Sequence, residues 1–135
     1  MKIKNNISKF VKYNANPFGV KTGDCVIRAI STALNISWAR TYKEMLDVTL
    51  ETGYAISCKD NFTEYLKRKG FKKQKMPKRA NGKKYRLSEF IDEIADAKGV
   101  YVVSVYNHLT EVDNATVHDL WDCRNRCVLG YWKIK

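Results

Sequence analysis

The stretch Thr22-Gly-Asp-Cys25-Val-Ile-Arg28-Ala-Ile-Ser31-Thr-Ala33 decides how this chain folds, because a glycine turn here leads from an irregular segment into a helix. Apolar residues recur along it at helical spacing and predict one buried face. Thr22 or Asp24 is placed to cap the first backbone amides. The sequence therefore predicts a helix that begins at Cys25 and ends at Asn35.

Cys25 is a candidate nucleophile. A thiol in the first turn of a helix lies at the positive end of the helix dipole, which favours the thiolate, the reactive form. The alternative is a structural cysteine that acts as a small buried apolar side chain. The two interpretations differ in whether the fold places a base beside the thiol.

Length and composition predict one domain over residues 1–135, with residues 1–15 as an extended amino-terminal arm. The chain is 44% hydrophobic and 12% aromatic, which is enough for one core, and its 135 residues are too few for two. Its four cysteines are too few and too irregularly spaced for a disulfide framework. We see no signal peptide and no apolar run of membrane-spanning length, so we expect a cytoplasmic protein without membrane contacts.

The net charge is +11, from 25 Lys and Arg against 14 Asp and Glu. An excess of this size attracts acidic proteins, nucleic acids or anionic lipids. The run from Lys67 to Arg86 contains no acidic residue and is either a solvated loop or edge strand, or a partner surface. No recognised nucleic-acid motif accompanies it. Its basic residues are Lys67, Arg68, Lys69, Lys72, Lys73, Lys75, Lys78, Arg79, Lys83, Lys84 and Arg86.

Helical periodicity fills most of the first two thirds of the chain. Three further helices are expected, one between a Ser37 cap and Gly53, one over about 60–69, and one over 89–97 after a Ser88 cap. The first of these carries an apolar stripe that we expect to be core, formed by Trp38, Tyr42, Met45 and Leu46 with Leu50 at its end. The basic run between them predicts a short strand near 71–75 and a turn at Asn81-Gly82.

Strand patterns fill the last third. A β-branched and aromatic run covers 100–106, and 108–112 and 116–119 form a hairpin around Asp113-Asn114. A last strand covers 127–134. The fold class is therefore α+β, with amino-terminal helices packed on a carboxy-terminal antiparallel sheet.

The hairpin supplies the base that Cys25 needs. With a turn at Asp113-Asn114, residues whose numbers sum to about 227 face each other, which puts His108 opposite Asp119. A nucleophile, a base and a group that orients the base form a working set. The sequence therefore predicts catalytic roles for Cys25, His108 and Asp119. The alternative for the last two is a half-exposed cross-strand polar pair.

Other polar residues are candidates for supporting roles. His118 adjoins Asp119 and should point to the opposite face of its strand, and Asp122 is the reserve orienter. Asn14 or Asn16 either donates its side-chain amide to an oxyanion, together with the Cys25 amide, or only makes turns.

A metal site is a further alternative. Zinc bound by Cys123, Cys127, His118 and Cys58 is conceivable, but the paired-cysteine spacing is loose and occurs once. We therefore expect neither a metal nor another cofactor.

The order of these features resembles the papain-like cysteine peptidase fold. It is most similar to the bacteriocin-processing (C39-like) peptidases and to small papain-like proteins of phages and bacteria. The residues that carry the resemblance are Gly23-Asp-Cys25-Val-Ile-Arg28-Ala29, His108, Val117-His-Asp119-Leu-Trp121-Asp122 and Tyr131-Trp132. Many papain-like enzymes have a glutamine about six residues before the cysteine, where this chain has Gly19.

The resemblance implies a nucleophilic Cys25, a general base and acid at His108, and an orienting carboxylate at Asp119. We expect a thiol hydrolase or acyl-transferase that acts on a peptide or other amide, with an acidic protein partner docked on the 67–86 run. The alternative is a catalytically inactive papain-like effector, such as a phage protein in host cytoplasm, that binds a host protein or nucleic acid through this run.

Overall fold

The computed structural model describes residues 7–135, so the expectations for the first six residues, including part of the predicted arm, lie outside the described residues. Over these described residues the chain has an α+β fold with four helices and a five-stranded sheet. In chain order the elements are β1 (Lys9–Lys12), α1 (Cys25–Leu34), α2 (Trp38–Thr52), α3 (Lys59–Arg68), α4 (Leu87–Glu93), β2 (Val100–Val105), β3 (His108–Asp113), β4 (Thr116–Asp119) and β5 (Val128–Lys133).

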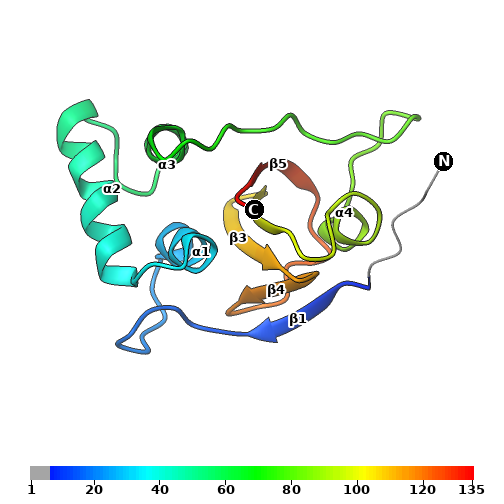
Figure 1. Cartoon of the computed structure of the whole chain (residues 1–135), viewed down its shortest axis with the longest axis horizontal. Coiled ribbons are helices and arrows are strands. Elements are labelled where there is room, and N and C mark those ends of the chain that lie inside the picture. The colour runs from blue at the N-terminus through cyan, green and yellow to red at the C-terminus, as the bar shows by residue number, and fades with distance from the viewer. Residues whose placement is uncertain (1–6) are drawn as a thin grey trace.

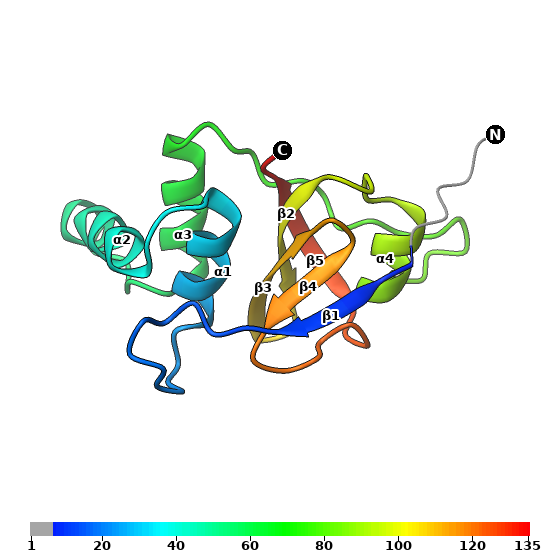
Figure 2. The same cartoon turned by 60° about the horizontal axis from the view of Figure 1, so that its bottom comes forward.

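The sheet lies between two groups of helices (Figure 1). Helices α1, α2 and α3 gather on one side of it, and α4 lies on the other. The strand order is β1-β4-β3-β2-β5. Figure 2 shows β1 running along β4, to which it is parallel, whereas the other neighbours are antiparallel. The carboxy-terminal strands are antiparallel to one another, as expected, but residues 9–12 of the arm add a parallel edge strand that the sequence pattern did not predict, which makes the sheet mixed.

Two apolar cores hold these layers together. One lies between α1, α2 and α3 and the sheet face that carries Val102, Leu109 and Trp132. The other lies between α4 and the face that carries Val103 and Val112. Alternation along each strand supplies both faces with apolar side chains. The central strands β2 and β3 are consequently mostly buried, whereas the edge strand β1 is largely exposed.

The predicted limits of α1, α2 and α3 are confirmed to within a residue or two. Asn35 ends α1 in the left-handed conformation, with a φ of 54°, and Gly53 ends α2 with a φ of 80°. The Ser37 side chain accepts a hydrogen bond from the Arg40 amide at the start of α2. Gly70, at a φ of 94°, follows α3.

The buried face of α2 differs from the prediction. Met45 is buried as expected, but its neighbours in the core are Thr41 and Val48. The rest of the predicted stripe is half-buried or exposed: Trp38, Tyr42, Leu46 and Leu50. Apolar residues on α2 fall into two adjacent rows, and packing against α1 and α3 selects only one of them.

Helix α4 begins and ends earlier than predicted. Its cap is Arg86, whose amide donates to Glu89 Oε1 at 2.9 Å, so Ser88 lies inside the helix. Leu87 and Phe90 are fully buried, and their burial fixes where the helix begins. The helix ends at Glu93, before the predicted limit of 97.

The basic run after α3 is mostly loop. Gln74 makes one isolated bridge to Tyr131, so the short strand predicted at 71–75 was wrong. The predicted turn at 81–82 is confirmed, with Gly82 at a φ of 83°. No helix within residues 7–135 is both long and apolar enough to cross a membrane.

The β3–β4 hairpin turns one residue later than predicted. Asn114 and Ala115 both have positive φ, 49° and 60°, which is the geometry of a type I′ turn. Val112 therefore pairs with Val117, and continuing this register places Asp119 opposite Thr110 rather than His108. The predicted register was wrong by two positions, which leaves every side chain on its predicted face because side chains alternate with a period of two.

A buried acid–histidine pair lies on the face of the hairpin opposite Asp119. Glu111 is fully buried, and its Oε1 lies 2.9 Å from His118 Nδ1, which is also 3.3 Å from Asp113 Oδ2. Burial raises the pKa of Glu111, His118 lowers it and Asp113 raises it, and together they bring it to about 8. The hydrogen bond to Glu111 raises the pKa of His118. The folded state therefore binds protons here more tightly than the unfolded state.

This pair predicts a pH-dependent contribution to stability. Because the folded-state pKa of Glu111 is raised, its contribution is fully present below the usual value of 4.5 and is lost as pH rises toward about 8. Across this pH range the unfolding free energy of the wild type should fall by at least about 1.4 kcal/mol more than that of Glu111→Gln. This amount corresponds to a shift of one pKa unit. Urea denaturation of both proteins at several pH values, with exposed Glu51→Gln as control, measures this. Parallel curves for wild type and Glu111→Gln would contradict it.

Candidate active site

Cys25 is the first residue of α1 and is held there by Asp24. The Asp24 side chain is buried and does not cap the helix. It accepts hydrogen bonds from Trp38 Nε1 at 2.9 Å and Asn16 Nδ2 at 3.2 Å, and Arg28 Nε lies 3.4 Å from it. These contacts fix the turn that precedes the cysteine, and they leave the first amides of α1 without a side-chain cap from Asp24.

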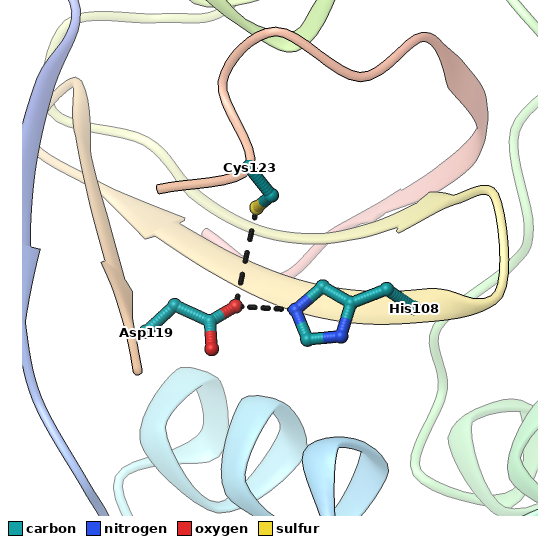
Figure 3. A group of neighbouring side chains, drawn as sticks. All are labelled: His108, Asp119 and Cys123. Carbon is teal, nitrogen blue, oxygen red and sulfur yellow. Dashed lines mark hydrogen bonds and ion pairs between the residues drawn. The ribbon is translucent and has the colours of Figure 1, made fainter. Parts of the chain in front are cut away.

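The opposite wall of the site is the β3–β4 hairpin. His108 Nε2 lies 2.6 Å from Asp119 Oδ2 (Figure 3). The same carboxylate accepts Thr110 Oγ1 at 2.6 Å and the Leu120 amide at 2.7 Å, and Cys123 Sγ approaches it at 3.9 Å. Asp119 is therefore a saturated acceptor that fixes the imidazole ring in one orientation.

Cys25 and His108 lie beside each other, and hydrogen bonding and charge between them lower the pKa of the thiol and raise that of the imidazole. Since Nε2 is bound to Asp119, the ring offers Nδ1 to the cysteine, and this nitrogen points toward α1 in Figure 3. The backbone of Leu109 makes a second hydrogen bond to the thiol. A helix start and a strand start thus meet at one sulfur atom.

The electrostatics favour an ion pair between Cys25 and His108. Burial works to raise the pKa of the Cys25 thiol, but the His108 and Leu109 hydrogen bonds and the charges of His108 and Arg28 together lower it. Burial works to lower the pKa of His108, but hydrogen bonds to Asp119, Cys123 and Cys25 raise it to about 11. Burial also opposes ionisation of Asp119, yet His108 and Thr110 hold its pKa below the usual value. All three shifts favour the charged form of the group: thiolate for Cys25, imidazolium for His108 and carboxylate for Asp119.

The sulfur faces a cleft with room for a substrate. Cys25, His108 and Leu109 line a cavity of about 530 Å³ whose other wall comes from α3 and β5. The Trp121 ring lies against His108 with ring centroids 4.7 Å apart and planes inclined by 43°, and the Arg126 guanidinium lies 5.2 Å from the centre of the Trp121 ring. The imidazole is therefore shielded on one side and open to the cleft beside the sulfur.

The structure brings Cys25, His108 and Asp119 together, as the sequence suggested, although from a shifted hairpin register. The reserve Asp122 is elsewhere, since its carboxylate binds Arg124 Nε at 2.9 Å and Nη2 at 2.8 Å. Sequence reasoning gave Thr110 no role, named Trp121 only for the family resemblance and considered Cys123 only as a zinc ligand, although each of them contacts His108 or Asp119. Thr110 lies two residues from His108 in the same strand, so strand alternation could have placed it on the same face as His108.

Asn14 and Asn16 have their amides engaged within the arm. Asn14 Nδ2 donates to the Val20 carbonyl at 3.1 Å, and its Oδ1 accepts the Asn16 amide. Asn16 Nδ2 donates to Asp24, and its Oδ1 accepts the Phe18 amide at 2.9 Å. These contacts fit the turn interpretation, and Asn16 positions Asp24 and so the helix start.

The zinc alternative does not assemble in the described part of the chain. His118 clusters with Glu111 and Asp113, whereas Cys123 clusters with His108 and Asp119. His118 and Cys123, two of the four residues that the zinc site would need together, therefore lie in separate groups.

Some of the basic run is neutralised within the protein. Arg68 pairs with Glu51 and Glu64, Lys69 pairs with Glu44, and Arg79 pairs with Glu89 and Glu93. Lys73 lines the cleft beside Cys25. The other members are exposed: Lys67, Lys72, Lys75, Lys78, Lys83, Lys84 and Arg86.

Comparisons with known proteins leave the site to be interpreted from its own geometry. The chain matches no protein-family model, no curated protein and no solved structure.

The lowered pKa of Cys25 predicts selective alkylation. Iodoacetamide should modify Cys25 at least tenfold faster than Cys58, Cys123 or Cys127 at pH 6, because hydrogen bonding and charge from His108 lower the pKa of the Cys25 thiol. His108→Ala should remove the selectivity and move the reaction to alkaline pH. Mass spectrometry of each cysteine peptide across pH 4–10 measures both effects. Equal rates at the four cysteines would contradict the ion pair.

Proposed function

We propose that this protein is a papain-like thiol hydrolase or acyl-transferase that acts on a peptide or other amide through a thioester at Cys25. The observation that carries the proposal is His108, which binds Asp119 through one ring nitrogen at 2.6 Å and offers the other to Cys25. A nucleophile, a base and an orienting carboxylate aligned in this order are the working parts of covalent acyl transfer.

The geometry supports a two-step mechanism. The Cys25 thiolate attacks the carbonyl carbon, the C=O electron pair moves to oxygen, and the Cys25 amide at the start of α1 can donate to that oxygen. The C–N bond then breaks as the His108 imidazolium gives its proton to the leaving amine. Neutral His108 next removes a proton from water or an acceptor amine, which attacks the thioester and releases the thiolate.

The arrangement of the fold supports the same reading. The helix that carries Cys25 packs directly on β3, the strand that begins at His108. Asp119 follows at the end of β4, so the order of helix, histidine strand and acid strand is that of the papain-like resemblance. Gly19, in place of the glutamine common in that family, leaves the second oxyanion donor unassigned.

A binding role without catalysis is the second candidate. The exposed lysines of the 67–86 run form a basic surface that would suit an acidic protein or a nucleic acid. Such a module would use the surface and have no need of the Cys25 thiolate.

The proposed function predicts a covalent acyl-enzyme. With a fluorogenic peptide-amide library at pH 7, Cys25→Ala should lower turnover at least about 10³-fold, since the nucleophile is lost. Cys58→Ala, which changes a thiol outside the site, should leave turnover unchanged. Acid quenching followed by mass spectrometry should find the acyl group on Cys25. If wild type and Cys25→Ala are equally inactive on the library and no acylated Cys25 appears, the binding role takes its place.

A further inference from the structure

The cleft beside the nucleophile carries two lysines and no acid. Lys59, at the start of α3, and Lys73, in the following loop, line the same cavity of about 530 Å³ as Cys25 and His108. None of the described residues that line this cavity is an aspartate or a glutamate. The cavity is therefore positively charged on the side that a substrate must occupy to reach the sulfur.

Lys73 is held in the cleft by a close fit to β5. A Cβ added at Gly130 would lie 2.7 Å from Lys73 Cε, so only glycine leaves room for this side chain in its present position. The Lys73 ammonium lies 5.9 Å from the centre of the Trp132 ring, within cation–π range. Lys73 is half-buried, unlike the neighbouring Lys72 and Lys75 of the basic run.

The two ammonium groups lie close enough to affect each other. Burial lowers the pKa of Lys73, and the adjacent Lys59 lowers it further. Within residues 7–135 neither lysine forms an ion pair with a carboxylate, whereas Arg68, Lys69 and Arg79 of the same region do. Two like charges without a counter-ion are unfavourable, and an anion placed between them would remove the repulsion.

We propose that Lys59 and Lys73 form a subsite for a carboxylate of the substrate, held next to the bond that Cys25 attacks. The substrate would be an acidic peptide, with the carboxylate on a side chain or at a chain terminus. This inference rests on the proposed function, because it places a substrate in the cleft. It also gives one residue of the basic run a role distinct from that of the exposed lysines.

The test compares haloacetyl reagents that differ only in charge. Iodoacetyl-Glu amide and iodoacetyl-Gln amide carry the same reactive carbon, and iodoacetyl-Gly as free acid or amide places the charge at a chain terminus instead. Rates at Cys25 are measured by mass spectrometry for wild type, Lys59→Gln and Lys73→Met. Methionine keeps the length of the side chain against Gly130 without its charge.

In the wild type, the acidic reagent of at least one of the two pairs should alkylate Cys25 about tenfold faster than its neutral counterpart. A factor of ten is the scale of local electrostatic steering. Each lysine variant should reduce this preference to about twofold or less. Lys72→Gln, with an exposed lysine outside the cleft, should retain it. Gly130→Ala, which keeps the net charge but displaces Lys73, should reduce it as well.

The outcomes separate this inference from the proposed function. A reactive Cys25 with no charge preference, or with a preference that Lys72→Gln lowers as much as Lys73→Met, overturns the subsite and leaves the nucleophile intact. A Cys25 that reacts no faster than the other cysteines with any reagent overturns both. A larger charge preference with the Glu and Gln reagents indicates that the subsite binds a side-chain carboxylate, and a larger preference with the two Gly reagents indicates a terminal carboxylate.

Discussion

The site depends on the contacts of one buried group, the carboxylate of Asp119. It accepts hydrogen bonds from His108, Thr110 and the Leu120 amide within the sheet. Arg28 of α1 reaches its other oxygen at 4.0 Å and also pairs with Asp24 at 3.4 Å. Helix and hairpin are thus joined by a row of alternating charges. A carboxylate this buried is stable only with such donors around it, so the fold and the orientation of the imidazole are fixed together.

The same alternation continues into the proposed chemistry. The pKa shifts of Asp119, His108 and Cys25 all favour the charged form, so a negative, a positive and a negative group would follow one another and stabilise each other. Beyond the sulfur, Lys59 and Lys73 add positive charge to the cleft. An acidic substrate would extend the series by one more charge. Desolvation opposes every member, so the ionised state depends on the whole row being present.

Local patterns predicted much of this arrangement and failed where distant packing decides. The end of α1 follows from its left-handed cap at Asn35, and the helix start at Cys25 and the strands around His108 follow from periodicity. His108 and Asp119 were found in spite of a wrong register, because a shift of two keeps both on one face. The four-residue strand β1 carries too weak a pattern to predict, and it forms only because β4 offers it a free edge.

The most direct test of this account is to measure whether His108 is a stable imidazolium beside Cys25. Long-range ¹H–¹⁵N NMR of the His108 ring, recorded from pH 5 to 10 in wild type and Cys25→Ala, reports the protonation of both ring nitrogens. We predict that both nitrogens stay protonated at pH 7 in wild type, and that the His108 pKa falls in Cys25→Ala, where the thiolate is lost. A wild-type His108 that is neutral at pH 7, with the same titration in Cys25→Ala, would contradict the central claim.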